Sequence, residues 1–503
     1  MEDHGLALDP PPAADFAACE PHRSPALVWL FAGLVSAGIA LYAFTRAFVW
    51  DEGFHLVAAQ MILAGKKPYL DFCFPQTPLN AYWNALWMRV LHQSWRVSHI
   101  PAVLELDGAV VLLTRYLLSR FPDARWRSAC TLAGIAFLGV NATMVQFGPI
   151  AQAYAICAFT LTAAFIFATD AVQKPQVWCS VAAGLSIGCG AAASLLIAPA
   201  APVILLWLWF KNVVGSRSAK AAVFLLGSAI PFAPVVWLFV QGPHQTWFNI
   251  VTYQAMFRRA DWKPDTAFSH DFDVLTGWYD SGQILLLCSC ALAAVLFFRR
   301  HKEFGRFRSE FWLALWMSLS LVAYIATAHP TFGRYFIVGM PLYAIVAAPG
   351  LMVIALRFSA SARPRRAASA LLALLLFGLL RAQVTDLDAA TWDRYEQMAS
   401  AIAGVTPPAA RLLSDEHIYF LLHRAPPPGM EFSYSHKVDV PAKEAALLHI
   451  IPIKELKSQI SKGQFATIQT CDDDKIDDWN LASLYKQRKD IADCSIFWDY
   501  EKH

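Results

Sequence analysis

Three carboxylates in one polar segment are the first candidates for chemistry. Asp51 and Glu52 lie a few residues after an apolar run at 27–45, and Asp71 lies further along. A carboxylate can accept the proton of an attacking hydroxyl group, and such catalysis typically contributes ~10²–10⁴-fold to a rate. Successive helical residues point about 100° apart, so Asp51 and Glu52 have different roles. We predict Asp51 as the general base, Glu52 as its orienting residue or a metal ligand, and Asp71 as a second candidate acid. The alternative for Glu52 is a polar residue exposed on the surface.

Four cationic side chains are candidates for binding an anion such as a phosphate group. Arg334 and His329 lie in the short outside connection between the apolar runs at 311–328 and 335–356. Arg258 and Arg259 share a long polar loop at 242–281. A guanidinium group can hold phosphate through two parallel hydrogen bonds. The alternative for Arg334 is an arginine that extends from a helix end towards water.

Two further groups of polar residues are candidates for a function. His270, Asp271 and Asp273 can hold a divalent metal ion, although such loop residues more often hold nothing. Glu105 and Asp107 lie inside a predicted spanning helix, where acids are energetically costly and often functional. Their alternative is a helix end that interfacial water still reaches.

Composition predicts an all-α polytopic membrane protein. Of the 503 residues, 57% are hydrophobic and 16% are charged, whereas about a quarter are charged in an ordinary soluble domain. The net charge of +3 gives no sign of nucleic-acid binding. Apolar runs approach the ~20 residues that cross ~30 Å of hydrocarbon. We predict about eleven transmembrane helices, at 27–45, 99–119, 128–147, 151–169, 178–194, 196–210, 221–241, 282–298, 311–328, 335–356 and 367–381.

The positions of lysine and arginine predict the orientation. Cytoplasmic loops are enriched in these residues. With a cytoplasmic N-terminus, the inside loops hold Arg120, Arg125, Arg127, Lys174, Lys211, Arg217, Lys220, Arg299, Arg300, Lys302, Arg306, Arg308, Arg357, Arg363, Arg365 and Arg366. The chain then divides into a disordered cytoplasmic tail (1–26), a transmembrane domain (27–381) with a first outside loop (46–98), and a soluble outside domain (382–503).

The first outside loop is expected to contain two amphipathic helices. Apolar residues recur at helical spacing after Asp51 and again after Pro78. Asp51 and Thr77 are placed to cap these helices, and capping is the alternative role for Asp51. Gly65 is placed to end the first helix. Because both segments are too polar to span but rich in Trp and Tyr, we expect them to lie on the outer membrane surface.

The C-terminal region is expected to be a small mixed α/β domain. We predict strands at 411–413 and 446–453, and a helix at 454–461. Cys471 and Cys494 both lie in this domain, and an oxidising compartment would permit a disulfide between them.

The first loop resembles one known family, the GT-C glycosyltransferases, and within it the protein mannosyltransferase and aminoarabinose transferase types. A first helix is followed by an acidic pair that opens an outside loop, and then by proline- and tyrosine-containing turns. The residues that carry the resemblance are Trp50-Asp51-Glu52, Gly65, Pro68-Tyr69-Leu70-Asp71, Pro75-Gln76-Thr77-Pro78-Leu79 and Tyr82. The local likeness covers about 46–120, and the topology extends it to about 381.

The resemblance implies a GT-C fold and an enzyme of the outer membrane face. It would move a sugar from a polyprenyl-phosphate carrier to an acceptor hydroxyl, with inversion, using an acid of the first loop. Tyr69, Gln76 and Tyr82 would shape the groove. The acceptor would be an unidentified glycan, lipid or protein, membrane lipid would be a partner, and a divalent ion is the one possible cofactor. The implied location is the bacterial inner membrane, with the C-terminal domain periplasmic.

One departure and two alternatives remain. Aminoarabinose transferases have a glutamate-lysine-proline sequence near Gln76-Thr77-Pro78, so a lysine that can contact phosphate is absent here. A transporter or flippase of a lipid-linked saccharide is the alternative function, although no internal repeat supports it. A glycan-binding scaffold would keep the groove but would not need Asp51.

Overall fold

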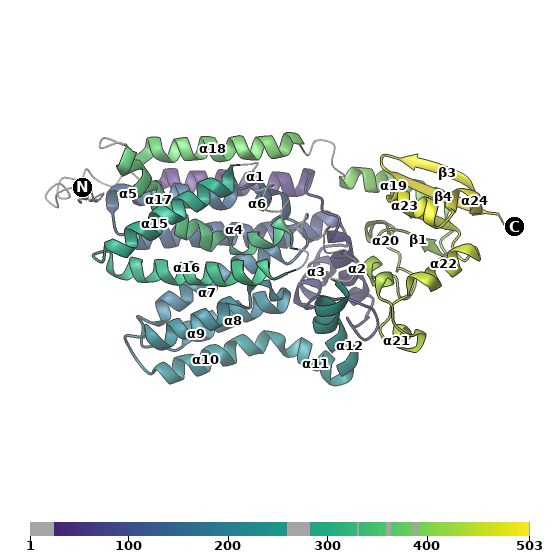
Figure 1. The fold of residues 1–503 in the computed structure, drawn as a ribbon, viewed down its shortest axis with the longest axis horizontal. Coiled ribbons are helices and arrows are strands. Elements are labelled where there is room, and N and C mark those ends of the chain that lie inside the picture. The colour runs from purple at the N-terminus through teal and green to yellow at the C-terminus, as the bar shows by residue number, and fades with distance from the viewer. Residues whose placement is uncertain (1–24, 259–281, 329–330, 359–363, 386–390, 502–503) are drawn as a thin grey trace, which may run out of the picture.

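The structure is a computed structural model that describes residues 25–258, 282–328, 331–358, 364–385 and 391–501 (Figure 1). Two parts lie end to end along the long axis, a bundle of helices and a smaller C-terminal domain, with α2 (Glu52–Leu63) and α3 (Leu79–Val90) beside their junction. The described chain begins at the bundle end that lies opposite to the C-terminal domain.

The long helices of the bundle run roughly parallel to the long axis of the molecule (Figure 1). Its elements are α1 (Ala26–Thr45), α4 (Trp95–Arg120), α5 (Ala124–Gly139), α6 (Ala142–Phe147), α7 (Tyr154–Ala171), α8 (Trp178–Ala193), η2 (Leu195–Ile197), α9 (Ala200–Phe210), α10 (Arg217–Ala229), η3 (Ile230–Phe232), α11 (Ala233–Gln241), α12 (Pro243–Trp247), η4 (Phe248–Phe257), α15 (Gln283–Arg300), α16 (Gly305–Ala326), η5 (Gly333–Gly339), α17 (Met340–Phe358) and α18 (Pro364–Thr385). Of these, η4 is a π-helix and η2, η3 and η5 are 3-10 helices.

The predicted spans are helical in the structure. Within the described residues, 8 helices are long and apolar enough to cross a membrane. The other three predicted spans correspond to α5 with α6, to α8, and to η2 with α9, which are shorter. The break before α6 has a local cause, since Asn141 accepts a hydrogen bond from the Met144 backbone N–H at 3.0 Å and caps a new helix.

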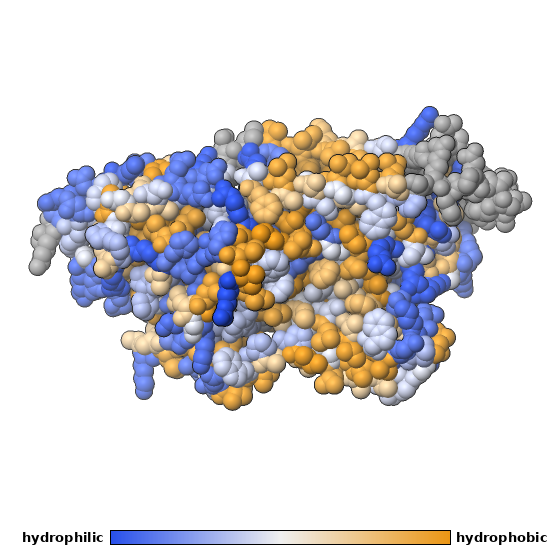
Figure 2. All heavy atoms as spheres, turned by 180° about the vertical axis from the view of Figure 1, so that it is seen from behind, coloured by the Kyte–Doolittle hydropathy of each residue, from blue (hydrophilic) through white to orange (hydrophobic). Residues whose placement is uncertain are grey.

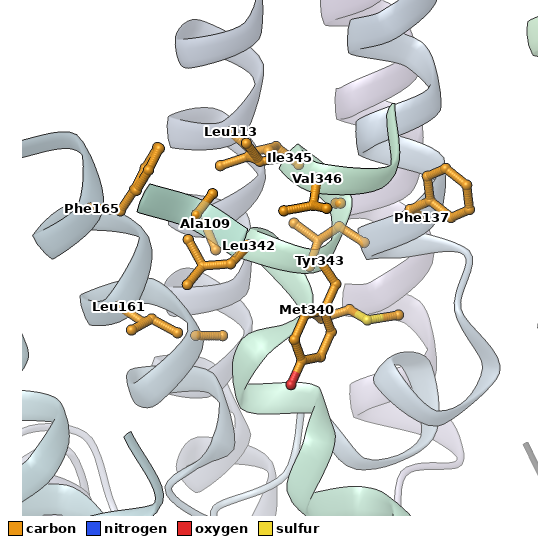
Figure 3. Packing of buried hydrophobic residues seen from close by; sticks show 14 of the residues in the cluster. Ala109, Leu113, Phe137, Leu161, Phe165, Met340, Leu342, Tyr343, Ile345 and Val346 are labelled. Atoms are coloured by element: carbon orange, nitrogen blue, oxygen red, sulfur yellow. The ribbon is translucent and has the colours of Figure 1, made fainter. Parts of the chain in front are cut away.

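The core of the bundle surrounds α17. Figure 3 shows Leu342 and Ile345 of α17 among Ala109 and Leu113 of α4 and Leu161 of α7. In its most apolar window, the segment Gly333–Arg357 is 89% buried, whereas Arg217–Gln241 is 17% buried. The helix α17 is therefore central, and α10 and α11 present apolar side chains outwards. Figure 2 shows hydrophobic residues over the bundle surface and hydrophilic residues gathered over the C-terminal domain.

Charged side chains at the bundle end opposite to the C-terminal domain have close partners. Asp170 accepts hydrogen bonds from Arg120 and, at 2.7 Å, from Lys174. Lys220 is fully buried, and its Nζ donates to the Asn212 side chain and to the carbonyl groups of Ala171, Lys174 and Val214 at 2.6–2.7 Å. Such bonds are needed because an unpaired buried charge is strongly destabilising.

The two helices of the first loop form as predicted, but their surroundings differ. Every residue of α2 from Glu52 to Met61 is buried, because α2 packs against α3 and against α20 (Glu416–Leu421) of the C-terminal domain. The prediction that α2 lies on the membrane surface is therefore wrong. Gly65 has a φ of 82° just after the helix, as a terminating glycine should.

Neither predicted cap forms. The Asp51 side chain accepts no hydrogen bond from the start of α2, and the residue before α3 provides no side-chain cap either. Thr77 instead donates to the Ala191 carbonyl group at 3.4 Å. Tertiary partners have thus taken both side chains away from their local roles.

The C-terminal domain contains a mixed sheet with helices around it. Its order is β1-β2-β4-β3, with β1 parallel to β2 and the other neighbours antiparallel. The strands are β1 (Leu412–Leu413), β2 (Thr467–Thr470), β3 (Tyr485–Ile491) and β4 (Cys494–Tyr500), and the other elements are α19 (Trp392–Val405), α20, η6 (Ser433–Lys437), α21 (Ala442–Leu447), α22 (Ile453–Ser461), α23 (Asp473–Asp478) and α24 (Leu481–Leu484).

The predicted strand at 446–453 is wrong, since α21 and a turn occupy it, whereas the helix at 454–461 corresponds to α22. The apolar run at 446–453 favoured a strand, because a short apolar run cannot be told from another buried segment by its pattern alone. In the structure only some of its positions are buried. A disulfide joins Cys471 to Cys494 across the ends of β2 and β4.

Candidate active site

Asp51 and Arg334 meet at the junction between the bundle and the C-terminal domain. Asp51 precedes α2, and Arg334 is the second residue of η5. The Arg334 Nη2 donates a hydrogen bond to Asp51 Oδ2 across 283 residues of sequence. The two side chains are 26% and 18% exposed, so the pair is sheltered but still reachable from solvent.

The guanidinium group of Arg334 keeps unused capacity. Its Cζ lies 4.3 Å from the centroid of the Phe332 ring and 5.9 Å from that of Phe147. The hydroxyl groups of Tyr154 and Tyr335 also interact with it electrostatically. Among the described residues, its buried Nε has no hydrogen-bond partner. A buried donor without a partner is energetically costly, so a ligand that accepts from this N–H gains stability. An anion is such a ligand.

A second guanidinium group lies beside the first. Arg258 at the end of η4 donates from Nη2 to the Tyr335 hydroxyl oxygen at 2.7 Å, and its Cζ lies 5.4 Å from the Tyr335 ring centroid. Tyr335 follows Arg334 directly, so two cations from distant loops share one neighbourhood. Arg259 and His329 lie outside the described residues.

Glu52 is buried and points away from solvent. Its Oε1 accepts from the backbone N–H of Ala151 at 2.8 Å and lies 2.6 Å from His99 Nε2. The other ring nitrogen of His99 lies 2.7 Å from the Ala43 carbonyl oxygen. Glu52 therefore ties α2 to α1, to α4 and to the segment before α7, next to Asp51. The alternative that Glu52 is an exposed surface residue is wrong, because its side chain is 0% exposed.

The same segment before α7 is held from the other side by α3. Asn80 and Asn84 both donate side-chain N–H groups to the Ala151 carbonyl oxygen, at 3.0 and 2.8 Å. Sequence analysis missed these residues and His99. The available signals were two amides four residues apart on an otherwise apolar helix face, and a histidine within a spanning helix.

The remaining first-loop residues build the loop itself. Asp71 Oδ2 accepts from the Lys67 backbone N–H at 2.7 Å, and the Tyr69 hydroxyl donates to the Gln76 carbonyl oxygen at 2.6 Å. Tyr69 is fully buried at a φ of 70°, and burial raises the pKa of its hydroxyl. Tyr82 is half-buried, which also raises its pKa. Within the described residues, no contact joins Asp71 to the Asp51–Arg334 pair.

The C-terminal domain covers the start of α2. A Cβ atom at Gly53 would lie 2.8 Å from the His417 ring, so only glycine allows this approach. Burial raises the pKa of the Glu416 carboxyl group, and the charge of Asp51 raises it further. Burial likewise raises the pKa of Tyr434, with Asp51 again adding to the shift. Residues of the soluble domain thus lie within electrostatic reach of Asp51.

His417 is enclosed by aromatic rings. Its ring centroid lies 4.9 Å from that of Phe48, 5.0 Å from Tyr395 and 5.3 Å from Trp392. Burial lowers its pKa to about 3, so it stays neutral and helps to dock the two parts.

The other acidic candidates have different surroundings. Trp83 of α3 donates from Nε1 to Glu105 Oε1 at 2.8 Å, which ties α3 to α4. Asp107 has a buried Oδ1 without a partner among the described residues. His270, Asp271 and Asp273 lie outside the described residues. Within the described part of the chain, no group of three or more His, Cys, Asp or Glu side chains could hold a metal ion.

Comparisons with known proteins give structural relatives but no sequence relatives. No protein-family model matches the chain, and no curated protein matches it significantly. ArnT from Cupriavidus metallidurans bound to undecaprenyl phosphate is similar at a TM-score of 0.65 and 14% identity, over 94% of this chain and 98% of that chain. The same protein in its apo state gives a TM-score of 0.65, 12% identity and the same coverage, 94% and 98%.

A further solved structure, the arabinosyltransferase EmbB from Mycobacterium smegmatis, gives a TM-score of 0.48 at 15% identity, over 75% of this chain and 39% of that chain. The near-complete match to ArnT establishes the fold of this chain. It is a multi-pass helical membrane protein of the GT-C fold with a small C-terminal α/β domain, and that prediction is confirmed.

Proposed function

We propose that this chain is a membrane glycosyltransferase that moves a sugar from a polyprenyl-phosphate carrier to an acceptor hydroxyl group. The observation that carries the proposal is the pair of Asp51 and Arg334, a carboxylate and an incompletely bonded guanidinium group at the mouth of a GT-C bundle. A related fold binds undecaprenyl phosphate in ArnT, which supports the same class of carrier here.

Arg334 is proposed to bind the phosphate of the lipid-linked sugar. Its unpaired Nε–H and its neighbour Arg258 supply positive charge in one place. A charge-assisted hydrogen bond of this kind contributes about 1.5–3 kcal/mol. The two cations can take the place of the lysine that the Gln76-Thr77-Pro78 sequence lacks. The phosphate would compete with Asp51 for Arg334 and so leave the carboxylate free for the acceptor.

Asp51 is proposed to act as the general base. The acceptor oxygen attacks the anomeric carbon, its proton passes to the Asp51 carboxylate, and the bond from carbon to the phosphate oxygen breaks. The electron pair leaves with the polyprenyl phosphate, which is stable without protonation and is stabilised by Arg334. Attack opposite to the leaving group inverts the anomeric centre. Glu52 is proposed to fix the start of α2 rather than to react.

The experiment compares Asp51→Asn with wild type and with a matched control. Purified protein in lipid nanodiscs receives undecaprenyl-phosphate sugars, and release of undecaprenyl phosphate is measured with acceptor present. Asp51→Asn should fall by ~10²-fold or more, the usual size of a lost base. Asp71→Asn, which retains an oxygen for the Lys67 N–H, should transfer at a near wild-type rate. Near wild-type transfer by Asp51→Asn would remove the base assignment and favour a transporter or scaffold.

We also propose the bacterial inner membrane as its location, with the C-terminal domain on the periplasmic side. The alternation of basic loops supports this orientation, because the basic residues cluster at the bundle end that lies opposite to that domain.

A further inference from the structure

A groove in the C-terminal domain lies at the carboxyl ends of its two parallel strands. β1 ends at Leu413 and is followed by Ser414 and Asp415, and β2 ends at Thr470. In α/β sheets, ligands bind in the crevice outside the carboxyl ends of parallel strands. The groove has a deep inner part of about 50 Å³ and a wider outer part of about 370 Å³. His436, Lys475 and Trp479 line both parts, so the two are continuous.

The inner end is polar and organised. Gln469 donates from Nε2 to Asp415 Oδ2 at 2.7 Å and accepts at Oε1 from the Ser414 hydroxyl group at 2.6 Å. Among the described residues, the hydrogen bond from Gln469 reaches the Asp415 carboxyl group at Oδ2, and Oδ1 accepts none. Its Oδ1 is therefore available to a hydroxyl group that enters the groove. Burial raises the pKa of Asp415 to about 7, so this carboxyl group can accept or donate near neutral pH.

The outer part combines a flat aromatic ring with balanced charge. Trp479 is partly exposed there, and Lys475 Nζ lies 5.8 Å from its ring centroid. Lys475 also lies 3.5 Å from Asp472, and Lys457 lies 3.7 Å from Asp478. These lysines and aspartates neutralise one another, so the groove holds no excess charge for an anion or a cation.

These features select one class of ligand. A sugar ring has an apolar face that can stack on an indole, and hydroxyl groups that pair with carboxylate, amide and hydroxyl side chains. The size of the outer part lies in the range of small-molecule pockets, about 300–1,000 Å³. We propose that this groove binds a neutral sugar unit, stacked on Trp479 with its hydroxyl groups directed to Asp415 and Ser414.

The groove borders the candidate active site. The helix η6 (Ser433–Lys437) carries Ser433, Ser435 and His436 of the groove lining, and it also carries Tyr434, which is within electrostatic reach of Asp51. The Ser433 backbone N–H donates to Glu416 Oε1 at 2.7 Å, next to the start of α2. A saccharide in the groove would therefore lie beside the site, yet its binding requires no transfer and does not rest on the proposed function.

The test is saturation-transfer difference NMR on the full chain in lipid nanodiscs. The neutral probes are methyl α-D-mannopyranoside, methyl β-D-galactopyranoside and N-acetylglucosamine, and the charged probes are mannose 6-phosphate and glucuronate. Trp479→Ala removes the stacking surface, and Asp415→Asn keeps the size of the side chain but removes its charge. Trp178→Ala is the matched control, because Trp178 is 53% exposed at the start of α8, away from the groove.

At least one neutral probe should bind wild type and Trp178→Ala. Its affinity should fall by about tenfold or more in both groove variants, about 1.4 kcal/mol each, because Trp479→Ala removes the stacking surface and Asp415→Asn removes the charged acceptor. Three results would each overturn the proposal. They are no binding of any neutral probe, unchanged binding in both groove variants, and preferential binding of the charged probes. If Trp479→Ala does not fold, Asp415→Asn still tests the proposal, because it keeps the size of the side chain.

Discussion

Glu52→Gln tests whether the residue beside the proposed base is structural. His99 Nδ1 lies 2.7 Å from the Ala43 carbonyl oxygen, which can only accept, so Nδ1 carries a proton. His99 Nε2 lies 2.6 Å from Glu52 Oε1, which requires a second proton between them. The pair is therefore a buried imidazolium and carboxylate, or the equivalent neutral acid and imidazole. The Ala151 N–H donates to the same Oε1.

Glutamine cannot serve both partners. Its amide oxygen can accept from Ala151, but the unprotonated Nε2 of His99 then faces the same oxygen with a lone pair. One buried hydrogen bond is lost and one group is left unsatisfied, which costs about 1–3 kcal/mol in the free energy of unfolding. Glu52→Ala removes one member of a buried pair and should cost about 3–5 kcal/mol. Asp51→Asn alters a partly exposed pair and should cost no more than about 1 kcal/mol.

The assay measures unfolding of the purified protein in detergent and transfer per folded molecule. Glu52→Gln should lower stability and retain most transfer per folded molecule, whereas Asp51→Asn should do the reverse. If Glu52→Gln kept wild-type stability but lost transfer as Asp51→Asn does, Glu52 would be the reacting carboxylate and the positioning argument would be wrong.

Three further outcomes are expected. Arg334→Ala should raise the concentration of lipid-linked sugar for half-maximal rate by about tenfold or more, with the acceptor dependence unchanged, because about 1.5–3 kcal/mol of phosphate binding is lost; unchanged saturation would exclude Arg334 as the anchor. The pKa of Asp415 is raised to about 7 from ~3.9 in the unfolded chain, so its contribution to stability falls as pH rises through that window. Asp415→Asn should thus raise the melting temperature more at pH 8 than at pH 5, where the carboxyl group is ionised in the unfolded chain but still protonated in the folded one, and equal shifts at both would contradict this. Peptide mass spectrometry without reduction should recover Cys471 joined to Cys494 from cells, as the oxidising periplasm permits, and reduction should cost about 3 kcal/mol for a loop of 23 residues; free thiols would count against both the bond and the location.

Much of the fold could be predicted from the sequence, because hydropathy is a local property. A helix must bury or expose each side chain according to its solvent, so apolar runs such as 27–45 and 335–356 mark spans without knowledge of their neighbours. The same reasoning located α2 and α3 and their glycine terminator. It did less well in the C-terminal domain, where β2, β3 and β4 depend on pairing with distant strands.

Only the tertiary structure decided what the polar residues do. Asp51 and Thr77 had suitable local roles as caps, yet both side chains bond to residues far along the chain. Glutamate is usually found on protein surfaces, but Glu52 is fully buried because the C-terminal domain covers α2. Its three bonded segments come together only after the bundle has packed.

The sequence by itself determined the membrane-spanning class and the approximate spans, since these follow from hydropathy along short stretches, whereas the choice of Asp51 as the base rests on the family resemblance. The tertiary structure decided that Arg334 pairs with Asp51, that Glu52 is a buried anchor, and that Asp71 belongs to a turn. The physical reason is distance along the chain. Contacts between residues separated by 283 positions depend on how every intervening helix packs, and no local pattern records that packing.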